Sequence, residues 1–417
     1  MTAVTHTAAA PVPHPGASVP AAPALRRVLA RRLVERALAD LPVRLRYPDG
    51  RVVGGGGPAA PAIEVVRPDA LYARLGAEPK VGIGESYAAG DWHAATGTDL
   101  ADALTPFAAH LPSLLPAPLW RLRRLVDRAV PDALRNTRTG ARANISAHYD
   151  LSNELFAAFL DPTMTYSSAW FADDEPLDAA VRLEEAQLRK IDAMLDLAAV
   201  RPESDVLEIG TGWGALAIRA AQRGARVTTI TLSQEQAVLA RRRVADAGLS
   251  DRVDVRVQDY REVTGTYDAI VSVEMIEAVG DEFWPDYFGA LDRLLAVDGR
   301  VALQTITMAH ERYLASRRSV SWINKHIFPG GIIPSLRAID EVLHRHTRLH
   351  VSDRRDLDLH YARTLRLWRE RFLAQWPHIH ALGFDESFRR LWELYLAYSE
   401  AGFRSGYLGV SQLALTR

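Results

Sequence analysis

The residues best suited to bind a reactive ligand lie in one short stretch, VLEIGTGWGALAIRAA, at residues 206–221. Gly210, Gly212 and Gly214 permit a tight turn and a close approach of the backbone to a ligand. The helix that follows presents amide donors and a positive dipole end. With Ala215 the stretch also satisfies the G-x-G-x-x-G/A pattern of dinucleotide-binding folds. The turn alone therefore leaves a nucleotide-derived ligand and a purely structural turn both open.

The positions of the acidic residues distinguish a nucleotide-derived ligand from a structural turn, and one class of nucleotide site from another. A dinucleotide fold needs a carboxylate at the end of the second strand to hold a ribose, but that strand ends in ITLSQEQ, with no acid before Glu235. Glu208 lies two residues before the first glycine, as in S-adenosylmethionine methyltransferases, where such an acid orients the glycines and meets the methionine part. Asp259 closes the third strand, where that class contacts adenine. The pattern favours a methyltransferase over a dinucleotide enzyme or a structural turn.

These residues must be positioned by an alternation of strands and helices that begins at Asp205. Five apolar segments, separated by helical stretches, are DVLEIG, RVTTITLS, VDVRVQDY, YDAIVSVEM and GRVALQTIT. Such alternation predicts an α/β fold with a parallel sheet and right-handed crossovers. Ligands of such sheets bind at the carboxyl ends of the strands, where the glycine turn lies.

Composition excludes several classes of protein. The 417 residues contain no cysteine, which removes disulfides, thiolate nucleophiles and cysteine metal sites. A formal net charge of −1 gives no global field for nucleic acid, so we expect no nucleic-acid partner. No His/Asp/Glu set has metal-ligand spacing, and no metal is expected. No signal peptide and no run of about 18 apolar residues is present, which favours a cytoplasmic location.

The chain divides into four predicted parts. Residues 1–24 are an Ala/Pro/Thr-rich lead expected to be disordered. Residues 25–114 form a small α+β module that begins with a helix carrying a stripe of Leu25, Val28, Leu29 and Leu33. Residues 115–143 are a basic helical connector, which is either a solvated face or a patch for anionic phospholipid headgroups. Its arginines are Arg121, Arg123, Arg124, Arg128, Arg135, Arg138 and Arg142. Residues 144–417 form the methyltransferase domain.

Further stretches narrow the class. They are AHYDLSNELF (147–156), LDPTMTYSSAWF (160–171), VSVEMIEAVG (271–280), WINKHIFPGG (322–331) and HYARTLRLW (360–368). Together with LEIGTGWG they resemble, in the same order, the cyclopropane-fatty-acyl-phospholipid synthase family, which includes the mycolic acid cyclopropane synthases. The N-terminal module resembles, with looser motifs, the lipid-engaging domain of the longer bacterial members.

The resemblance implies a Rossmann-like class I methyltransferase domain with a lid insertion, preceded by a small α+β lipid-engaging domain. The stretch around WINKHIFPGG is the expected lid over an acyl tunnel. The implied reaction transfers the methyl of S-adenosylmethionine to the cis double bond of unsaturated acyl chains in membrane phospholipids. The product is either a cyclopropane or a 10-methylene chain, the precursor of a 10-methyl chain.

Several alternatives and partners stay open. The scaffold could serve a methyltransferase of soluble small molecules, or a lipid-binding protein with a decayed cofactor site. The implied partner is the anionic surface of the bilayer, with the protein peripherally associated with the inner face of the membrane. A homodimer and a separate reductase are left open by the sequence.

The resemblance also assigns the cofactor contacts residue by residue. The residues carried over are Tyr166, Ser167, Glu208, Gly210, Thr211, Gly212, Gly214, Thr231, Leu232, Gln236, Asp259 and Tyr260. Burial in a strand or turn would explain Leu232 without any ligand, but not the glycines or Gln236.

The family's base is a bound bicarbonate, which a glutamate and a tyrosine hold together with neighbouring polar groups. These map onto Glu277 and Tyr361. Because a carboxylate beside an anion must share a proton, we expect a raised pKa or a strong hydrogen bond there. The neighbouring groups depart from the family's pattern: Ser168 replaces a cysteine, and Gln304, beside Ile306, replaces a histidine. Serine and glutamine still hydrogen-bond an anion, but the position of the base could differ, and the product with it.

Overall fold

A computed structural model of the protein describes residues 18–110, 135–137, 140–141, 152–172 and 183–417. Most of the predicted lead and of the predicted basic connector, including Arg121, Arg123, Arg124 and Arg128, lies outside the described residues. No described helix combines the length and the apolar character that crossing a bilayer requires.

The large sheet has seven strands in the order β10-β11-β9-β8-β5-β6-β7. The five predicted segments form its parallel part, which confirms the α/β fold class. These strands are β5 (Asp205–Ile209), β6 (Arg226–Thr231), β7 (Val253–Val257), β8 (Tyr267–Val273) and β9 (Leu295–Met308). Two further strands, β10 (His350–Asp356) and β11 (Leu408–Thr416), add an antiparallel edge.

Helices cover both faces of this sheet because its central strands are apolar on both sides. Val206 belongs to the core on one face and its neighbour Leu207 to the core on the other. The first face packs against α8 (Leu183–Leu197), α9 (Ala215–Gln222) and α10 (Gln234–Asp246). The second face packs against α11 (Trp284–Leu294) and α14 (Leu336–His346).

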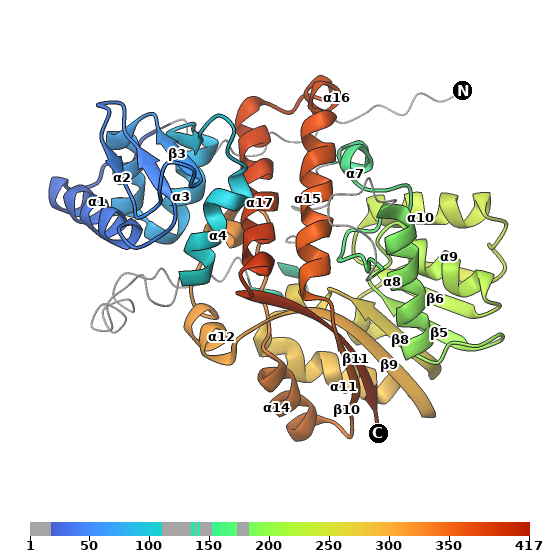
Figure 1. Cartoon of the computed structure of the whole chain (residues 1–417). Helices are drawn as coiled ribbons and strands as arrows, with labels where there is room; N and C mark the ends of the chain where they lie inside the picture. The colour runs from blue at the N-terminus through green and yellow to red at the C-terminus, as the bar shows by residue number, and fades with distance from the viewer. Residues whose placement is uncertain (1–17, 111–134, 138–139, 142–151, 173–182) are drawn as a thin grey trace.

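A small four-stranded sheet, in the order β2-β1-β3-β4, lies on the opposite side of the molecule (Figure 1). Its strands are β1 (Arg44–Arg46), β2 (Val52–Val53), β3 (Ala62–Val65) and β4 (Trp92–Ala94). Its helices are α1 (Ala24–Leu38), α2 (Pro68–Ala77), α3 (Pro79–Ala88) and α4 (Leu100–His110). The predicted apolar stripe on α1 is largely exposed, with Leu25 at 79%, Leu29 at 54% and Val28 at 49% exposure.

Two long helices, α15 (Asp358–Ala374) and α17 (Glu386–Arg404), stand side by side between the two sheets (Figure 1). They share one buried cluster with the small sheet and with α7 (Asn153–Phe159). The described residues also form shorter helices: α12 (His310–Ser316), α13 (Trp322–His326), α16 (Trp376–Ala381), and the 3₁₀ turns η2 (Tyr260–Glu262), η3 (Ile276–Ala278) and η4 (Asp281–Phe283). The N-terminal module thus packs directly onto α17, the neighbour of the helix that carries Tyr361.

Candidate active site

The predicted cofactor residues gather at the carboxyl ends of β5, β6 and β7. All of them except Gly214 line one pocket, and Gly214 instead caps α9 with a φ of 89°. Gly210 has a φ of 103°, and a Cβ there would lie 2.5 Å from Met275 Cγ. Only glycine fits this close approach, so the turn is shaped by the pocket wall behind it.

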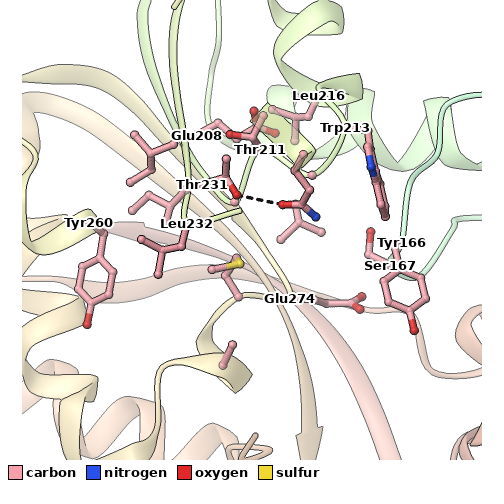
Figure 2. A pocket seen from close by; sticks show the side chains of 18 of the residues that line it. Tyr166, Ser167, Glu208, Thr211, Trp213, Leu216, Thr231, Leu232, Tyr260 and Glu274 are labelled. Carbon is pink, nitrogen blue, oxygen red and sulfur yellow. Dashed lines mark hydrogen bonds between the residues drawn. The ribbon is translucent and has the colours of Figure 1, made fainter. Parts of the chain in front are cut away.

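The acid of the turn is buried. Glu208 Oε2 accepts a hydrogen bond from Thr229 Oγ1 at 2.6 Å, and burial raises its pKa to about 8. A cationic ligand beside Glu208 would favour the ionised carboxylate. On the next strand, Thr231 donates to Gln236 Oε1 at 2.9 Å, the contact dashed in Figure 2. Asp259 is held by Arg261, whose Nε lies 2.8 Å from Oδ1.

The opposite wall of the pocket comes from the segment before α8. Figure 2 shows Tyr166 and Ser167 of this segment, together with Trp213 of the glycine turn, facing Leu232 and Tyr260 across the pocket. An acid, a glycine turn and aromatic or aliphatic walls suit the amino-acid, ribose and adenine parts of S-adenosylmethionine. The described residues therefore fit this cofactor.

A carboxylate that sequence reasoning did not single out, Glu274, lies at the centre of the predicted base site. Tyr361 donates its hydroxyl hydrogen to Glu274 Oε2 at 2.8 Å. Two further donors reach Oε1: the Ser168 backbone N–H at 2.9 Å and Gln304 Nε2 at 2.8 Å. Three of the residues predicted to hold an anion thus hold this side chain. Burial raises the pKa of Glu274, and these donors oppose that rise.

The backbone of Glu274 is unusual. It follows the last residue of β8 and has a φ of 52°, in the left-handed region that side chains other than glycine seldom adopt. Such strain persists only where the surrounding structure holds the residue in place. Here the strained backbone places the Glu274 carboxylate in the pocket wall, where it can contact a bound ligand.

Glu277 lies one turn further on and does not meet Tyr361. Its Oε1 accepts from Ile306 N at 2.6 Å and from Thr305 Oγ1 at 3.0 Å. Its Oε2 is buried and has no hydrogen-bond partner among the described residues. Burial, reinforced by the negative charge of Glu274, raises the pKa of Glu277 to about 8. The expected raised pKa is therefore present, while the tyrosine contact belongs to Glu274.

The remaining predicted residues contact this carboxyl pair through groups that the sequence did not specify. Ser168 contributes its backbone N–H, while its hydroxyl donates to the carbonyl of Ala169 at 3.0 Å. Ile306 likewise contributes only its backbone N–H to Glu277. Gln304 alone uses its side chain, and Gln412 Nε2 donates to its Oε1 at 3.1 Å from the opposite position on β11.

The predicted lid joins this site to the N-terminal module. Its backbone reaches the base site, where Ile332 N donates to the carbonyl of Glu277 at 2.8 Å. On the far side, Lys325 Nζ and His326 Nε2 lie 2.6 Å and 3.1 Å from Glu85 Oε1 on α3. A Cβ on Gly84 would collide with Trp322, so α3 and α13 are in close contact.

Comparison with known proteins places this geometry in a family. The family model for mycolic acid cyclopropane synthetase matches residues 136–413. The tuberculostearic acid methyltransferase UfaA1 of Mycobacterium tuberculosis is 52% identical over 405 residues, which cover 96% of this chain and 94% of that protein. The cyclopropane-fatty-acyl-phospholipid synthase of Escherichia coli K12 is 35% identical over 382 residues, covering 88% and 90% respectively.

Solved structures agree. The crystal structure of mycolic acid cyclopropane synthase CmaA1 in complex with SAH and CTAB superposes with a TM-score of 0.60 at 34% identity. The match covers 66% of this chain and 98% of that chain.

Proposed function

Since the chain belongs to the mycolic acid cyclopropane synthetase family and is an S-adenosylmethionine-dependent methyltransferase, we propose that it methylates the cis double bond of acyl chains on membrane phospholipids to give a methylene-branched chain. S-adenosylmethionine supplies an electrophilic methyl group on a positively charged sulfur. The observation that carries the proposal is the Glu274 carboxylate, held by Tyr361, Ser168 and Gln304 beside the cofactor pocket.

The reaction needs a base inside an apolar site. The π electrons of the alkene form a bond to the methyl carbon, the sulfur keeps the electron pair of the broken bond, and the neighbouring chain carbon becomes a cation. A 1,2-hydride shift moves the positive charge to the methylated carbon, and loss of one methyl proton leaves an exomethylene group. We infer that Glu274 accepts that proton, because its carboxylate lines the cofactor pocket and is fixed in place there by three donors. Without the hydride shift, loss of a methyl proton closes a cyclopropane.

Aromatic rings around Tyr361 support a transient cation. The rings of Tyr361 and Phe403 have centroids 4.6 Å apart, and Trp368 meets Tyr361 edge-on at 6.1 Å. A cation over an aromatic face gains about 0.5–2 kcal/mol. Since about 1.4 kcal/mol corresponds to a tenfold change in rate, these faces assist the reaction but do not replace the base.

We propose that Glu274 takes the place of the bicarbonate expected from the family resemblance. The donors that would hold a bicarbonate already bind the Glu274 carboxylate, and a second anion beside that carboxylate would add repulsion. The described residues therefore do not fit a bound bicarbonate. No step of the proposed reaction depends on one.

The choice of the methylene product rests on the similarity to the tuberculostearic acid methyltransferase, at 52% identity over 96% of the chain. Turning an exomethylene group into a methyl branch requires two electrons and two protons. The reductant belongs to a separate reaction, and the product expected from this protein alone is the methylene-branched chain.

We further propose that α1 contacts the anionic membrane surface. Leu25, Val28 and Leu29 are exposed on it, and Arg32 and Arg36 follow on the same face. Exposed leucines beside arginines are the pattern by which a helix lies on an anionic bilayer. This surface adds to the binding expected of the basic connector.

The test incubates the protein with S-adenosylmethionine and vesicles of oleoyl phosphatidylglycerol, followed by mass spectrometry of the fatty acid esters. A gain of one CH₂ per chain supports the reaction class, and NMR of the product distinguishes vinylidene protons from cyclopropane protons. Cofactor binding without any gain of mass would contradict the lipid substrate and favour a soluble one.

A further inference from the structure

Lys190 is a buried cation beside the cofactor pocket, and the proposed reaction assigns it no role. It lies on α8 with only 1% of its surface exposed, and it lines the cofactor pocket. Its Nζ donates to Ser167 Oγ at 2.5 Å. Burying an ammonium group is costly unless nearby charges and hydrogen bonds offset the lost hydration. The position of Lys190 therefore requires a compensating interaction.

A second residue of the same helix holds the same segment without a charge. Gln187 lies one turn before Lys190, and its Nε2 donates to the carbonyl of Ser167 at 2.9 Å. The next residue, Ser168, gives its N–H to Glu274. One face of α8 thus fixes the strip of chain that lines the pocket and reaches the base. Gln187 therefore holds this segment in place by a hydrogen bond without adding a charge, and it serves as the uncharged comparison for Lys190.

Three carboxyl groups attract the ammonium electrostatically: Glu274 after β8 and Glu208 on β5, which line the same pocket as Lys190, and Asp161 in the turn after α7. Asp161 also attracts the guanidinium of Arg243, so its negative charge is divided between two cations. Burial raises the pKa of Glu208 to about 8, so this group is mostly neutral at pH 7. Of the carboxyl groups near Lys190, Glu274 acts on it most strongly.

The attraction works in both directions. Burial lowers the pKa of Lys190 to about 8, against the opposing pull of Glu274, Asp161 and Glu208, so the group is mostly cationic at pH 7. The same charge lowers the pKa of Glu274 against the rise that burial causes. The hydrogen-bond donors to Glu274 stabilise its charge locally, whereas Lys190 adds a full positive charge in a low-dielectric site.

We propose that Lys190 is a positioning residue for proton abstraction, which holds Ser167 in the cofactor pocket and supplies the positive charge that keeps Glu274 ionised. The inference rests on the proposed role of Glu274 as the base. It joins the two halves of the site: the helix that fixes the cofactor wall also sets the protonation of the base.

The test compares Lys190→Met with Gln187→Met, which removes the other α8 contact to the same segment but no charge. The ionisation of Glu274 is followed by infrared titration of the protonated carboxyl band that disappears in Glu274→Gln. We expect Lys190→Met to raise the midpoint of this band by about one pH unit or more, and Gln187→Met to leave it unchanged. This readout needs no lipid substrate.

Activity supplies the second readout. With saturating S-adenosylmethionine and oleoyl phosphatidylglycerol vesicles, the acidic limb of the pH–rate profile should move upward in Lys190→Met only, with a fall of about tenfold in rate at pH 7. Gln187→Met should lower the rate and the cofactor affinity at every pH.

A chemical variant covers the case in which Lys190→Met does not fold. Because the chain has no cysteine, Lys190→Cys introduces a single thiol that can be alkylated. Alkylation with 2-bromoethylamine returns an amine and should restore the low midpoint of Glu274. Alkylation with iodoacetamide, which adds length without charge, should not.

The proposal is overturned if the Glu274 midpoint is the same in wild type and Lys190→Met, or if Gln187→Met shifts it equally. It is also overturned if both alkylated forms behave alike. If wild type produces no methylated lipid while the midpoint still shifts, the proposed function fails and the electrostatic role of Lys190 stands.

Discussion

Tyr361 donates its hydroxyl hydrogen to Glu274 across 2.8 Å, although 87 residues separate the two in the chain. The bond joins α15, which packs on α17, to the strained residue that follows β8. Burial raises the pKa of Tyr361 well above its usual value, and the facing Glu274 carboxylate raises it further. Tyr361 is therefore a permanent donor, and Glu274 is the group that exchanges a proton.

Replacing the base should stop methyl transfer without removing the cofactor. Glu274→Gln keeps the shape but accepts no proton, and we expect a loss of at least about 100-fold in kcat, the usual contribution of a general base. Tyr361→Phe removes one hydrogen bond to a charged group and should cost about tenfold. Single-turnover assays measure the rate of methyl transfer, and calorimetric titration with S-adenosylmethionine measures the affinity for the cofactor. Full turnover by Glu274→Gln would show that another group is the base.

Glu277 should tolerate the same change. With its pKa raised to about 8 it is mostly neutral at pH 7, and glutamine copies a neutral carboxyl group, so we expect the rate to stay within about threefold. Because its folded pKa lies above the unfolded value, its contribution to stability is complete at acidic pH and declines as pH rises toward 8. Unfolding of Glu277→Gln should accordingly depend less on pH between 5 and 8. A collapse of activity equal to that of Glu274→Gln would transfer the role of base to Glu277.

The contact between the lid and the N-terminal module should weaken in acid. Burial alone would raise the pKa of Glu85, but hydrogen bonds from His326 and Lys325 outweigh it and lower the pKa to about 2. The stability from this contact is present above the unfolded pKa and is lost as pH falls toward 2.

The matching variant is Glu85→Gln, which we expect to destabilise the protein by about 1–2 kcal/mol at pH 7, since one partner is partly exposed. The deficit should shrink as pH falls from 5 to 2, as measured by urea unfolding. Glu370→Gln, which breaks an exposed pair with Arg366, is the control and should change stability by less than about 0.5 kcal/mol. A deficit in Glu85→Gln that is constant across this pH range would mean that the charge of Glu85 is not what stabilises the joint.

Membrane binding should depend on the exposed face of α1. Leu25→Asp combined with Leu29→Asp removes apolar contact and adds negative charge, so binding to phosphatidylglycerol vesicles should fall by about tenfold or more. Val297→Asp is the control, because Val297 is 86% exposed on a different surface. Vesicle sedimentation measures both. Equal loss in the two variants would remove α1 as the docking helix.

The sequence predicted those parts of the fold that local patterns determine. The glycine turn at Gly210 and the five parallel strands follow from apolar segments whose lengths and spacing identify them one by one. The antiparallel edge was not foreseen, because β10 is rich in Asp and Arg and pairs with β11, more than fifty residues away. Periodicity also predicted α1 but not that Leu25 and Leu29 on it would be exposed.

The sequence predicted most of the residues that line the pocket, but it predicted neither Glu274 nor the contacts at the base site. Glu274 and Glu277 are three residues apart in one block, and sequence spacing cannot tell which of them meets Tyr361. The reversal of the backbone at Glu274, with its φ of 52°, decides that question. An acid at the very end of a buried strand was the available signal, and the same signal had already identified Asp259.

The left-handed backbone at Glu274 makes this base exchangeable. Glycine adopts that conformation without strain, so Glu274→Gly should keep the fold while leaving a space the size of a carboxylate, still surrounded by the donors of Tyr361, Ser168 and Gln304. A small anion from solution could then enter, and formate or bicarbonate should restore turnover in proportion to its concentration. The wild-type enzyme, with its base attached to the chain, should work equally well in buffer free of carbon dioxide.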